Sequence, residues 1–342
     1  MRKWKLLGIR LNLFDGAPNT NLTTSTGSGN DLTGEMKTFY SNRLLQLMEP
    51  ELVHNQFGVK ESIPKNGGKT IEWRKWDPLP VNTTPLSEGV TPDGQKMNMG
   101  TVTAEIAQYG AYVTFSDLLE LTAIDNVLTQ AQEALASQAG RTLDTITREV
   151  LAGGTNVQYA EGQVTSRANL VGGADSGNHY LTVDAVRRAV RFLKVQHAPK
   201  INGYYVGIIH PDCSYDLMSD PKWVNVKSYS DPEDIYEGEI GRIEGVRFVE
   251  TADAKVWEKA GKNGSTASSR DVYSTLILGQ GAYGVVDLAG GGLEFIVKQV
   301  GSGGTADPLN QRGTAGWKAT HAAKRLLEQY MVRIETTSTF NS

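Results

Sequence analysis

KTIEWRKW (residues 69–76) and TVTAEIAQY (residues 101–109) are the two stretches that decide the fold. In the first, β-branched and aromatic residues alternate with charged ones, and this pattern predicts a strand. The second continues through Phe115 and predicts another strand, with a bulge or a bend at Gly110.

The connection between these two strands has several prolines and glycines and no apolar core of its own. A loop of this length without secondary structure is uncommon in a compact domain, and where one occurs it is generally either disordered or in contact with a partner. The apolar residues Val81, Leu86, Val90, Met97 and Met99 are scattered through it. They have little to bury against within one subunit.

A long helical pattern follows the second strand. Thr114-x-x-Asp117 and Thr122-x-x-Asp125 are both plausible helix starts, because an acidic residue stands in the first turn. Apolar residues then recur at spacings of three and four along one stripe: Ile124, Val127, Leu128, Ala131, Leu135, Ala139, Leu143, Ile146 and Val150. Gly153 and Gly154 end the pattern, which predicts a rod of about 40 Å.

Several separate segments carry a resemblance to a known family. In chain order they are Ile63–Glu72, Pro78–Pro80, Leu86–Gln95, Ala107–Thr114 and Ser137–Asp144. They resemble major capsid proteins of tailed bacteriophages, and the resemblance extends from about Leu32 to about Thr337. It implies an α+β fold of the icosahedral shell-forming type that encapsulins share.

The resemblance also implies a division of the chain into parts. It places an N-terminal arm with a short helix at 1–62 and an extended loop, a long β-hairpin, at 63–113. A peripheral domain with a long spine helix follows at 114–180, an axial domain at 181–289, and return strands of the peripheral domain at 290–342. The segment 16–34 is too polar to fold alone, and 35–52 has a helical pattern.

Further elements follow from local patterns. We expect short strands within 155–180, a helix from Thr182 to before Pro199, and a short helix after Pro211. Strands are expected at 204–210, 245–250, 272–278, 282–288 and 293–300, with loops at 260–270 and 301–316. Residues 317–331 favour a helix by propensity, whereas the resemblance implies a strand pair that turns near Glu328. We adopt the strand pair.

Composition excludes several classes of protein. The 342 residues are 39% hydrophobic, which is enough for a core, and the net charge of −4 does not point to a nucleic-acid-binding field. The single cysteine, Cys213, excludes an intramolecular disulfide framework and fits a reducing cytoplasm. No apolar run is long enough to span a membrane. Residues 1–11 superficially resemble a signal peptide, but Arg10 interrupts the apolar run and no cleavage site follows.

Motifs that would carry chemistry are incomplete. The run Gly279–Gly284 matches a dinucleotide-binding fingerprint, but a strand-like segment follows it instead of the required helix, so a turn is the simpler interpretation. The segment Gly68–Thr70 resembles a phosphate-binding loop, but Ile63 stands where the first glycine belongs.

Metal and nucleophile sites are not indicated either. The five histidines (His54, His179, His197, His210 and His321) share no metal-ligand spacing. Cys213 lies near His210, but no third residue completes a nucleophile–base arrangement. The acidic run Asp231, Glu233, Asp234, Glu237 and Glu239 lacks a calcium-loop pattern. We therefore predict no catalytic, cofactor-binding or metal-binding residue.

An assembly interface is the functional site that the sequence favours. Trp73 and Trp76 point to opposite faces of the first strand, so the same small core cannot hold both, and buried aromatic residues often anchor interfaces. The charged residues near them would set complementarity and register more than affinity. The candidates are Lys69, Trp73, Arg74, Lys75, Trp76, Leu86, Glu88, Val90, Asp93, Lys96 and Met97.

The resulting hypothesis is a structural protein. The resemblance implies a major capsid protein that self-assembles into hexamers and pentamers of an icosahedral head enclosing double-stranded DNA. Assembly would take place in the host cytoplasm, with portal, scaffolding and decoration proteins as further partners and no membrane. One alternative is an encapsulin-type shell that houses cargo, and another is a nucleotide-binding enzyme built on the Gly279 motif.

Overall fold

The computed structural model describes residues 52–64, 66–76, 79–86, 88–123, 127–160, 164–173, 177–223, 241–264, 266–288, 294–302 and 307–341. The polar segment and helix expected before residue 52 lie outside these residues. The chain divides into two compact units, each described by itself. Within the described residues, unit 1 contains Gly110–Ala139 and Leu293–Lys318, and unit 2 contains Glu49–Tyr109, Gly140–Gly292 and Ala319–Ser342.

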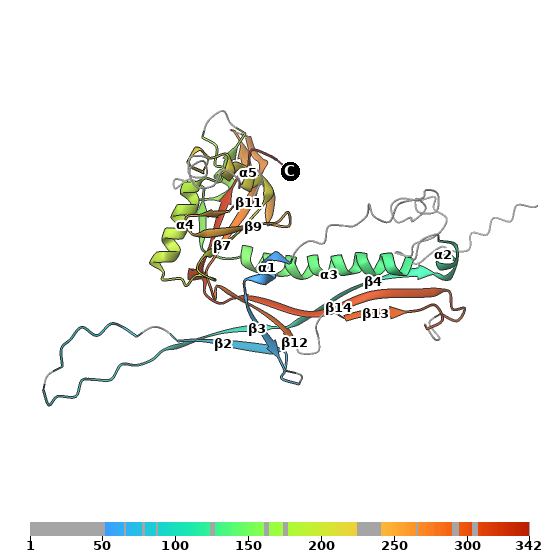
Figure 1. Cartoon of the computed structure of the whole chain (residues 1–342), viewed down its shortest axis with the longest axis horizontal. Helices are drawn as coiled ribbons and strands as arrows, with labels where there is room; N and C mark the ends of the chain where they lie inside the picture. Colours follow the sequence, from blue (N-terminus) through green and yellow to red (C-terminus); the bar gives the residue numbers. More distant parts are fainter. Residues whose placement is uncertain are drawn as a thin grey trace, which may run out of the picture. The chain divides into compact units, whose positions relative to one another are not determined.

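The long helix is present as α3, Val127–Ala152 (Figure 1). Leu135 and Ala139 of the predicted stripe are buried, as the helical spacing requires. The Gly153 N–H donates to the Glu149 carbonyl at 3.0 Å, so the helix ends where the glycines predict.

A shorter helix, α2 (Asp117–Thr122), precedes the spine helix in unit 1. Its cap is Ser116, whose hydroxyl accepts a hydrogen bond from the Leu119 N–H at 3.2 Å. The expected start at Thr114 is therefore wrong by two residues, because the chain is still a strand there. The alternative start at Thr122-x-x-Asp125 involves residues outside the described part.

The strands of unit 1 pack closely through glycines. In this unit β4 (Ala107–Ser116) and β13 (Glu294–Lys298) both pair with β14 (Arg312–Arg325). A Cβ at Gly313 would lie 2.4 Å from the Phe115 ring, and one at Gly110 would lie 2.6 Å from the Trp317 carbonyl oxygen. Side chains at these positions would therefore force the strands apart.

The prediction of a break at Gly110 is wrong. The break falls at Ile106, between β3 (Met99–Glu105) and β4, where the Ile106 N–H donates to the Lys69 carbonyl at 2.8 Å. Gly110 instead lies inside β4, where only a residue without a side chain fits against the facing strand.

Residues 317–331 form the strand pair that the resemblance implies. β14 continues to Arg325, a 3₁₀ turn η4 (Glu328–Tyr330) follows, and β15 (Met331–Thr336) returns. Burial alternates along β14 from Gly313 onward, as for a strand with one covered face. Helix propensity is thus overridden by packing, and the loop expected at 301–316 ends earlier, since β14 begins at Arg312.

Unit 2 is built on an eight-stranded sheet with the order β5-β15-β11-β7-β9-β8. In the same sheet β10 pairs with β11, and β6 pairs with β10. Its strands are β5 (Val157–Tyr159), β6 (Val171–Gly172), β7 (Tyr205–Ile209), β8 (Arg242–Ile243), β9 (Val246–Glu250), β10 (Val256–Asn263), β11 (Thr266–Leu278) and β15. The expected strands at 204–210, 245–250 and 272–278 are all present, the last within the longer β11.

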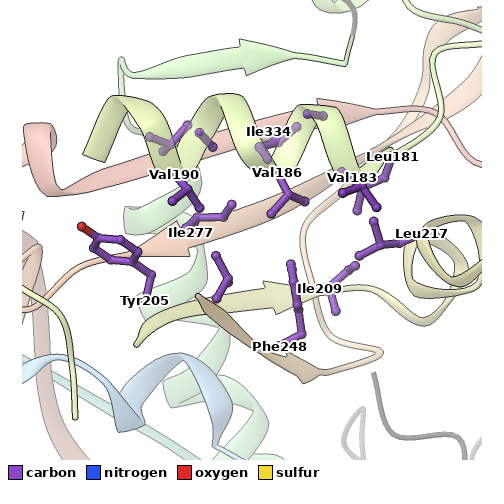
Figure 2. Packing of buried hydrophobic residues seen from close by; sticks show 14 of the residues in the cluster. Leu181, Val183, Val186, Val190, Tyr205, Ile209, Leu217, Phe248, Ile277 and Ile334 are labelled. Atoms are coloured by element: carbon purple, nitrogen blue, oxygen red, sulfur yellow. The ribbon is translucent and has the colours of Figure 1, made fainter. Parts of the chain in front are cut away.

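Helix α4 (Val183–Val195) packs against this sheet. It is capped by Thr182, whose hydroxyl accepts from the Ala185 N–H at 3.3 Å, as the sequence predicts. Figure 2 shows Val186 and Val190 pointing from α4 towards Ile277 and Ile334 of the sheet. The helix expected after Pro211 is α5 (Pro211–Met218), and a short 3₁₀ helix η2 spans Arg167–Asn169.

The exposed loop expected at 260–270 is wrong. These residues belong to a β-hairpin formed by β10 and β11, with Gly261 opposite Arg270. Gly261 is buried, and a Cβ there would lie 3.0 Å from the Leu170 carbonyl oxygen. Polar composition predicted a loop, but a strand with one open face tolerates polar residues.

Three further elements of unit 2 lead to the site. α1 (Val53–Gln56) is held to the spine helix by His54, whose Nδ1 lies 2.6 Å from the Asp144 carboxylate. β1 (Val59–Ile63) follows and pairs in parallel with β12 (Tyr283–Leu288). β12 pairs in turn with the end of β14.

Candidate assembly surface

The extended hairpin is anchored to its own subunit through one face. β2 (Thr70–Trp76) pairs antiparallel with β3, from Thr70 opposite Glu105 to Trp76 opposite Met99. Ile71 and Trp73 are half-buried and pack against the cluster of Ile63, Val286 and Ala322. A Cβ at Gly284 would lie 2.7 Å from the Trp73 ring. Trp73 therefore rests on β12 of its own chain.

The opposite face of the hairpin is exposed. Trp76 is 56% exposed, and Arg74 and Glu72 on the same face are also exposed, with their side chains 3.3 Å apart. The alternation of the sequence placed the two tryptophans on opposite faces, and the structure confirms this. Trp76 can therefore contact a partner without any change in the core of its own subunit.

The connection between β2 and β3 exposes its apolar residues. Val81 is 87% exposed and Leu86 74%, and Val90 and Met97 are exposed as well. A hydrogen bond of 3.3 Å from the Gln95 amide to the Pro80 carbonyl joins its two arms. Exposed apolar surface often marks a place where a protein binds a partner, so this loop is the candidate assembly surface.

Charged residues surround this apolar loop. Lys69 lies 2.6 Å from Glu105 across the base of the hairpin, with both side chains largely in water. This hydrogen bond and the charge attraction raise the pKa of Lys69 and lower the pKa of Glu105. Within the described residues, four other candidate charges make no ion pair: Lys75, Glu88, Asp93 and Lys96.

Sequence reasoning missed a second apolar surface, in unit 1. Leu118 and Leu121 of α2 are 50% and 82% exposed, whereas Leu119 between them is buried. Leu309 is also exposed. The signal was available in DLLELT, because three leucines in six residues exceed what one buried face of so short a helix can hold.

The region of Cys213 and His210 has no nucleophile geometry. Cys213 is fully buried, and burial raises the pKa of its thiol, which keeps it protonated and unreactive. Its Sγ lies 3.6 Å from the Thr336 hydroxyl. His210 instead caps α5, with its Nδ1 accepting from the Asp212 N–H at 3.2 Å.

The remaining motifs are structural where they are described. Gly279 and Gln280 lead into a turn at Gly281, which has a φ of 75°, and strand β12 follows instead of a helix. Among the described residues, no three His, Cys, Asp or Glu side chains gather as a metal ion would require. None of the described helices has the length and apolar character of a membrane span. The acidic run 231–239 lies outside the described part.

Known proteins resemble this chain in sequence and in fold. The sequence model of a family described as phage capsid protein matches residues 81–338. The capsid of Ralstonia phage GP4 is 13% identical with a TM-score of 0.65, and the match covers 93% of this chain and 99% of that one.

Two further capsid structures are also similar. The cyanophage P-SCSP1u capsid is 14% identical with a TM-score of 0.62, over 93% and 96% of the two chains. The capsid of Helicobacter pylori bacteriophage KHP30 is 8% identical with a TM-score of 0.60, over 98% and 99%. No curated protein matches significantly. At these identities the structural matches show a shared fold, which is the α+β capsid fold that the resemblance implied.

Proposed function

Because this chain belongs to the phage capsid protein family, we propose that it assembles through its β2–β3 loop into hexamers and pentamers of an icosahedral head. The chain is a structural component of the virion. The proposal adds that the head encloses double-stranded DNA and that it forms in the host cytoplasm.

The exposed apolar loop between β2 and β3 carries this proposal. Four large apolar side chains of this loop are more than half exposed: Val81, Leu86, Val90 and Met97. Full burial of such a side chain contributes about 1.5–3 kcal/mol, so the four would contribute about 6–12 kcal/mol on a neighbour before the cost of ordering them. Repeated over a closed shell, contacts of this size support cooperative assembly.

DNA is the expected content of the shell and not a tightly bound ligand. The subunit has a net charge of −4, so few phosphate charges would be neutralised at its surface. Binding would be weak and dependent on salt concentration. Portal, scaffolding and decoration proteins are further partners under this proposal.

The encapsulin-type shell receives less support. It would use the same fold and the same loop, but the family and the three structures described above are phage capsids. A groove that binds a cargo peptide would favour it.

The test removes the apolar side chains from the loop. We expect a variant with Val81, Leu86, Val90 and Met97 replaced by serine to remain folded, because none of the four packs on the subunit core. It should yield no shells in negative-stain electron microscopy, whereas wild-type protein, co-expressed with the other head proteins, yields closed shells.

A matched control carries four conservative changes in the same loop: Thr83→Ser, Thr84→Ser, Thr91→Ser and Asn98→Ser. It should assemble like the wild type. Normal shells from the apolar-to-serine variant would overturn the role of the loop.

A further inference from the structure

The chain contains three pairs in which an asparagine precedes a glycine: Asn66–Gly67, Asn202–Gly203 and Asn263–Gly264. Such a pair can lose the asparagine side-chain amide when the backbone nitrogen of the glycine attacks the asparagine Cγ. Glycine favours this attack, because it has no side chain to shield its nitrogen. Since all three asparagines precede the same residue type, the structure around each glycine N–H decides which pair reacts.

The Gly203 N–H is accessible for this attack. Asn202 and Gly203 have φ angles of 49° and 88°, both positive, as in the tight turns that join the strands of hairpins. The two hydrogen bonds across the turn join Ile201 and Tyr204, at 2.8 and 3.0 Å, and neither uses the Gly203 N–H. Asn202 and Gly203 are both exposed, and a Cβ at Gly203 would meet nothing within 4 Å.

The glycine nitrogens of the other two pairs are engaged in hydrogen bonds. The Gly67 N–H donates to the Pro64 carbonyl at 2.9 Å, and the Gly264 N–H donates to the Gly172 carbonyl at 3.1 Å. Each of these hydrogen bonds must break before the nitrogen can reach the preceding side chain. Asn263 is also held in the hairpin of β10 and β11.

The turn at Asn202 can open without disturbing the sheet. Its pairing of Ile201 with Tyr204 is an isolated bridge that lies outside the strands. Exposed segments with few contacts open locally at a much lower free energy than the core. Once these two hydrogen bonds are broken, the backbone of Asn202 can rotate until the Gly203 nitrogen meets Cγ.

We propose that Asn202 is a site of spontaneous deamidation. The Gly203 nitrogen forms a bond to the Asn202 Cγ and gives up its proton, the bond from Cγ to Nδ2 breaks, and ammonia leaves with that proton. Water then opens the resulting succinimide ring. Cleavage between the nitrogen and Cγ leaves aspartate, whereas cleavage between the nitrogen and the backbone carbonyl carbon leaves isoaspartate. Water is the co-reactant, and no group is oxidised or reduced.

The product changes the pocket that Asn202 lines. This pocket has a volume of about 750 Å³, and Tyr204 and Arg247 also line it. A carboxylate at position 202 adds a negative charge to a lining in which, among the described residues, Arg247 is the one charged side chain. Isoaspartate also lengthens the backbone of the turn, so the two hydrogen bonds between Ile201 and Tyr204 lose their geometry.

Peptide mapping of the full-length chain by mass spectrometry, after incubation at neutral pH, tests the proposal. The mass gained when a carboxylate replaces an amide identifies each converted asparagine. We expect Asn202 to convert about two- to tenfold faster than Asn66 and Asn263, the factor that one hydrogen bond at the competing glycine nitrogen represents. In concentrated urea, where the three turns are lost, the three rates should become similar.

Asn202→Gln is the matched variant, because it keeps the amide but moves it one carbon farther from the Gly203 nitrogen. Conversion at position 202 should stop, while Asn66 and Asn263 react as in the wild type. A rate at Asn202 equal to or below those of the other two asparagines in the folded chain would overturn the proposal. An advantage of Asn202 that persists unchanged in urea would do the same, because the local sequence and not the fold would then be its cause.

Discussion

Replacing Glu335 by glutamine should destabilise unit 2 strongly. Glu335 is fully buried in β15 between two arginines. Arg167 donates to both of its carboxylate oxygens, at 2.7 and 2.8 Å, and Arg333 donates to one of them at 2.8 Å. Arg333 is itself only 6% exposed, so the carboxylate is the charge that compensates its burial.

The size of the stability loss depends on how far water can solvate each arginine once the charge of Glu335 is removed. Breaking a buried ion pair costs about 3–5 kcal/mol, because a charge is left uncompensated. Arg167 is 32% exposed and can regain contact with water. Arg333 cannot, and burial already lowers the pKa of its guanidinium, against the opposing charge of Glu335. We therefore expect a loss near the lower end, about 3 kcal/mol.

Urea unfolding of the unassembled subunit, followed by circular dichroism, measures this loss. In a thermal scan it corresponds to a decrease in Tm of about 6–12 °C for a unit of this size. Glu105→Gln is the matched control, because it removes the same charge from the largely exposed pair with Lys69 and should leave the unfolding midpoint unchanged.

A double-mutant cycle with Arg167→Ala adds a second criterion. The two changes should couple by about 1 kcal/mol or more, since the residues share two hydrogen bonds. Equal midpoints for Glu335→Gln and Glu105→Gln, or strictly additive losses in the cycle, would refute the reasoning.

Two other predictions concern unit packing and acid stability. Gly110→Ala should lower the Tm by several degrees, because overpacking against a fixed backbone oxygen costs about 1–3 kcal/mol. The control Gly100→Ala should leave the Tm unchanged, because a Cβ at Gly100 meets open space. Equal Tm values for the two variants would contradict this. Glu328 accepts hydrogen bonds from a threonine and an arginine that lower its pKa below its ordinary value of 4.5. Its stabilisation is present above pH 4.5 and is lost as the pH falls through the lower folded pKa. The urea midpoints of Glu328→Gln and wild type should therefore differ at pH 6, and the difference should shrink progressively as the pH is lowered below 4.5; a constant difference would contradict this.

Local patterns in the sequence correctly predicted the helices and strands whose identifying residues lie close together in the chain. The spine helix and α4 have apolar stripes at helical spacing. Gly153 and Gly154 directly follow the end of α3, and the capping residue Thr182 directly precedes α4. β7 is an apolar run between polar residues, which needs no distant partner to be identified. These elements are present where the patterns place them.

Elements that depend on distant neighbours could not be predicted in this way. Gly110 is required by the carbonyl of Trp317, and nothing near Gly110 in the sequence indicates that contact. Residues 260–270 have the composition of a loop but pair as a hairpin. The strand pair after Trp317 was predicted only from the family resemblance, because its own residues favour a helix.

The same distinction applies to the assembly surface. Alternation in KTIEWRKW placed Trp73 and Trp76 on opposite faces, but it could not say which of them rests on the subunit. That depends on Gly284 and Val286, which lie far away in the sequence and leave room for one indole. The exposed leucines of α2 were missed although three leucines in six residues exceed what one buried face of so short a helix can hold.

The β2–β3 hairpin thus has two roles, and the alternation of side chains along β2 assigns them to opposite faces. The face that carries Trp73 is fixed to the core of unit 2, so changes there act on the stability of the subunit. The face that carries Trp76 and the loop beyond it leave apolar groups in water, at a cost that a lone subunit cannot recover. Because neighbouring positions of one strand serve different faces, the contact surface can change without changing the core, provided that the register of β2 against β3 is kept.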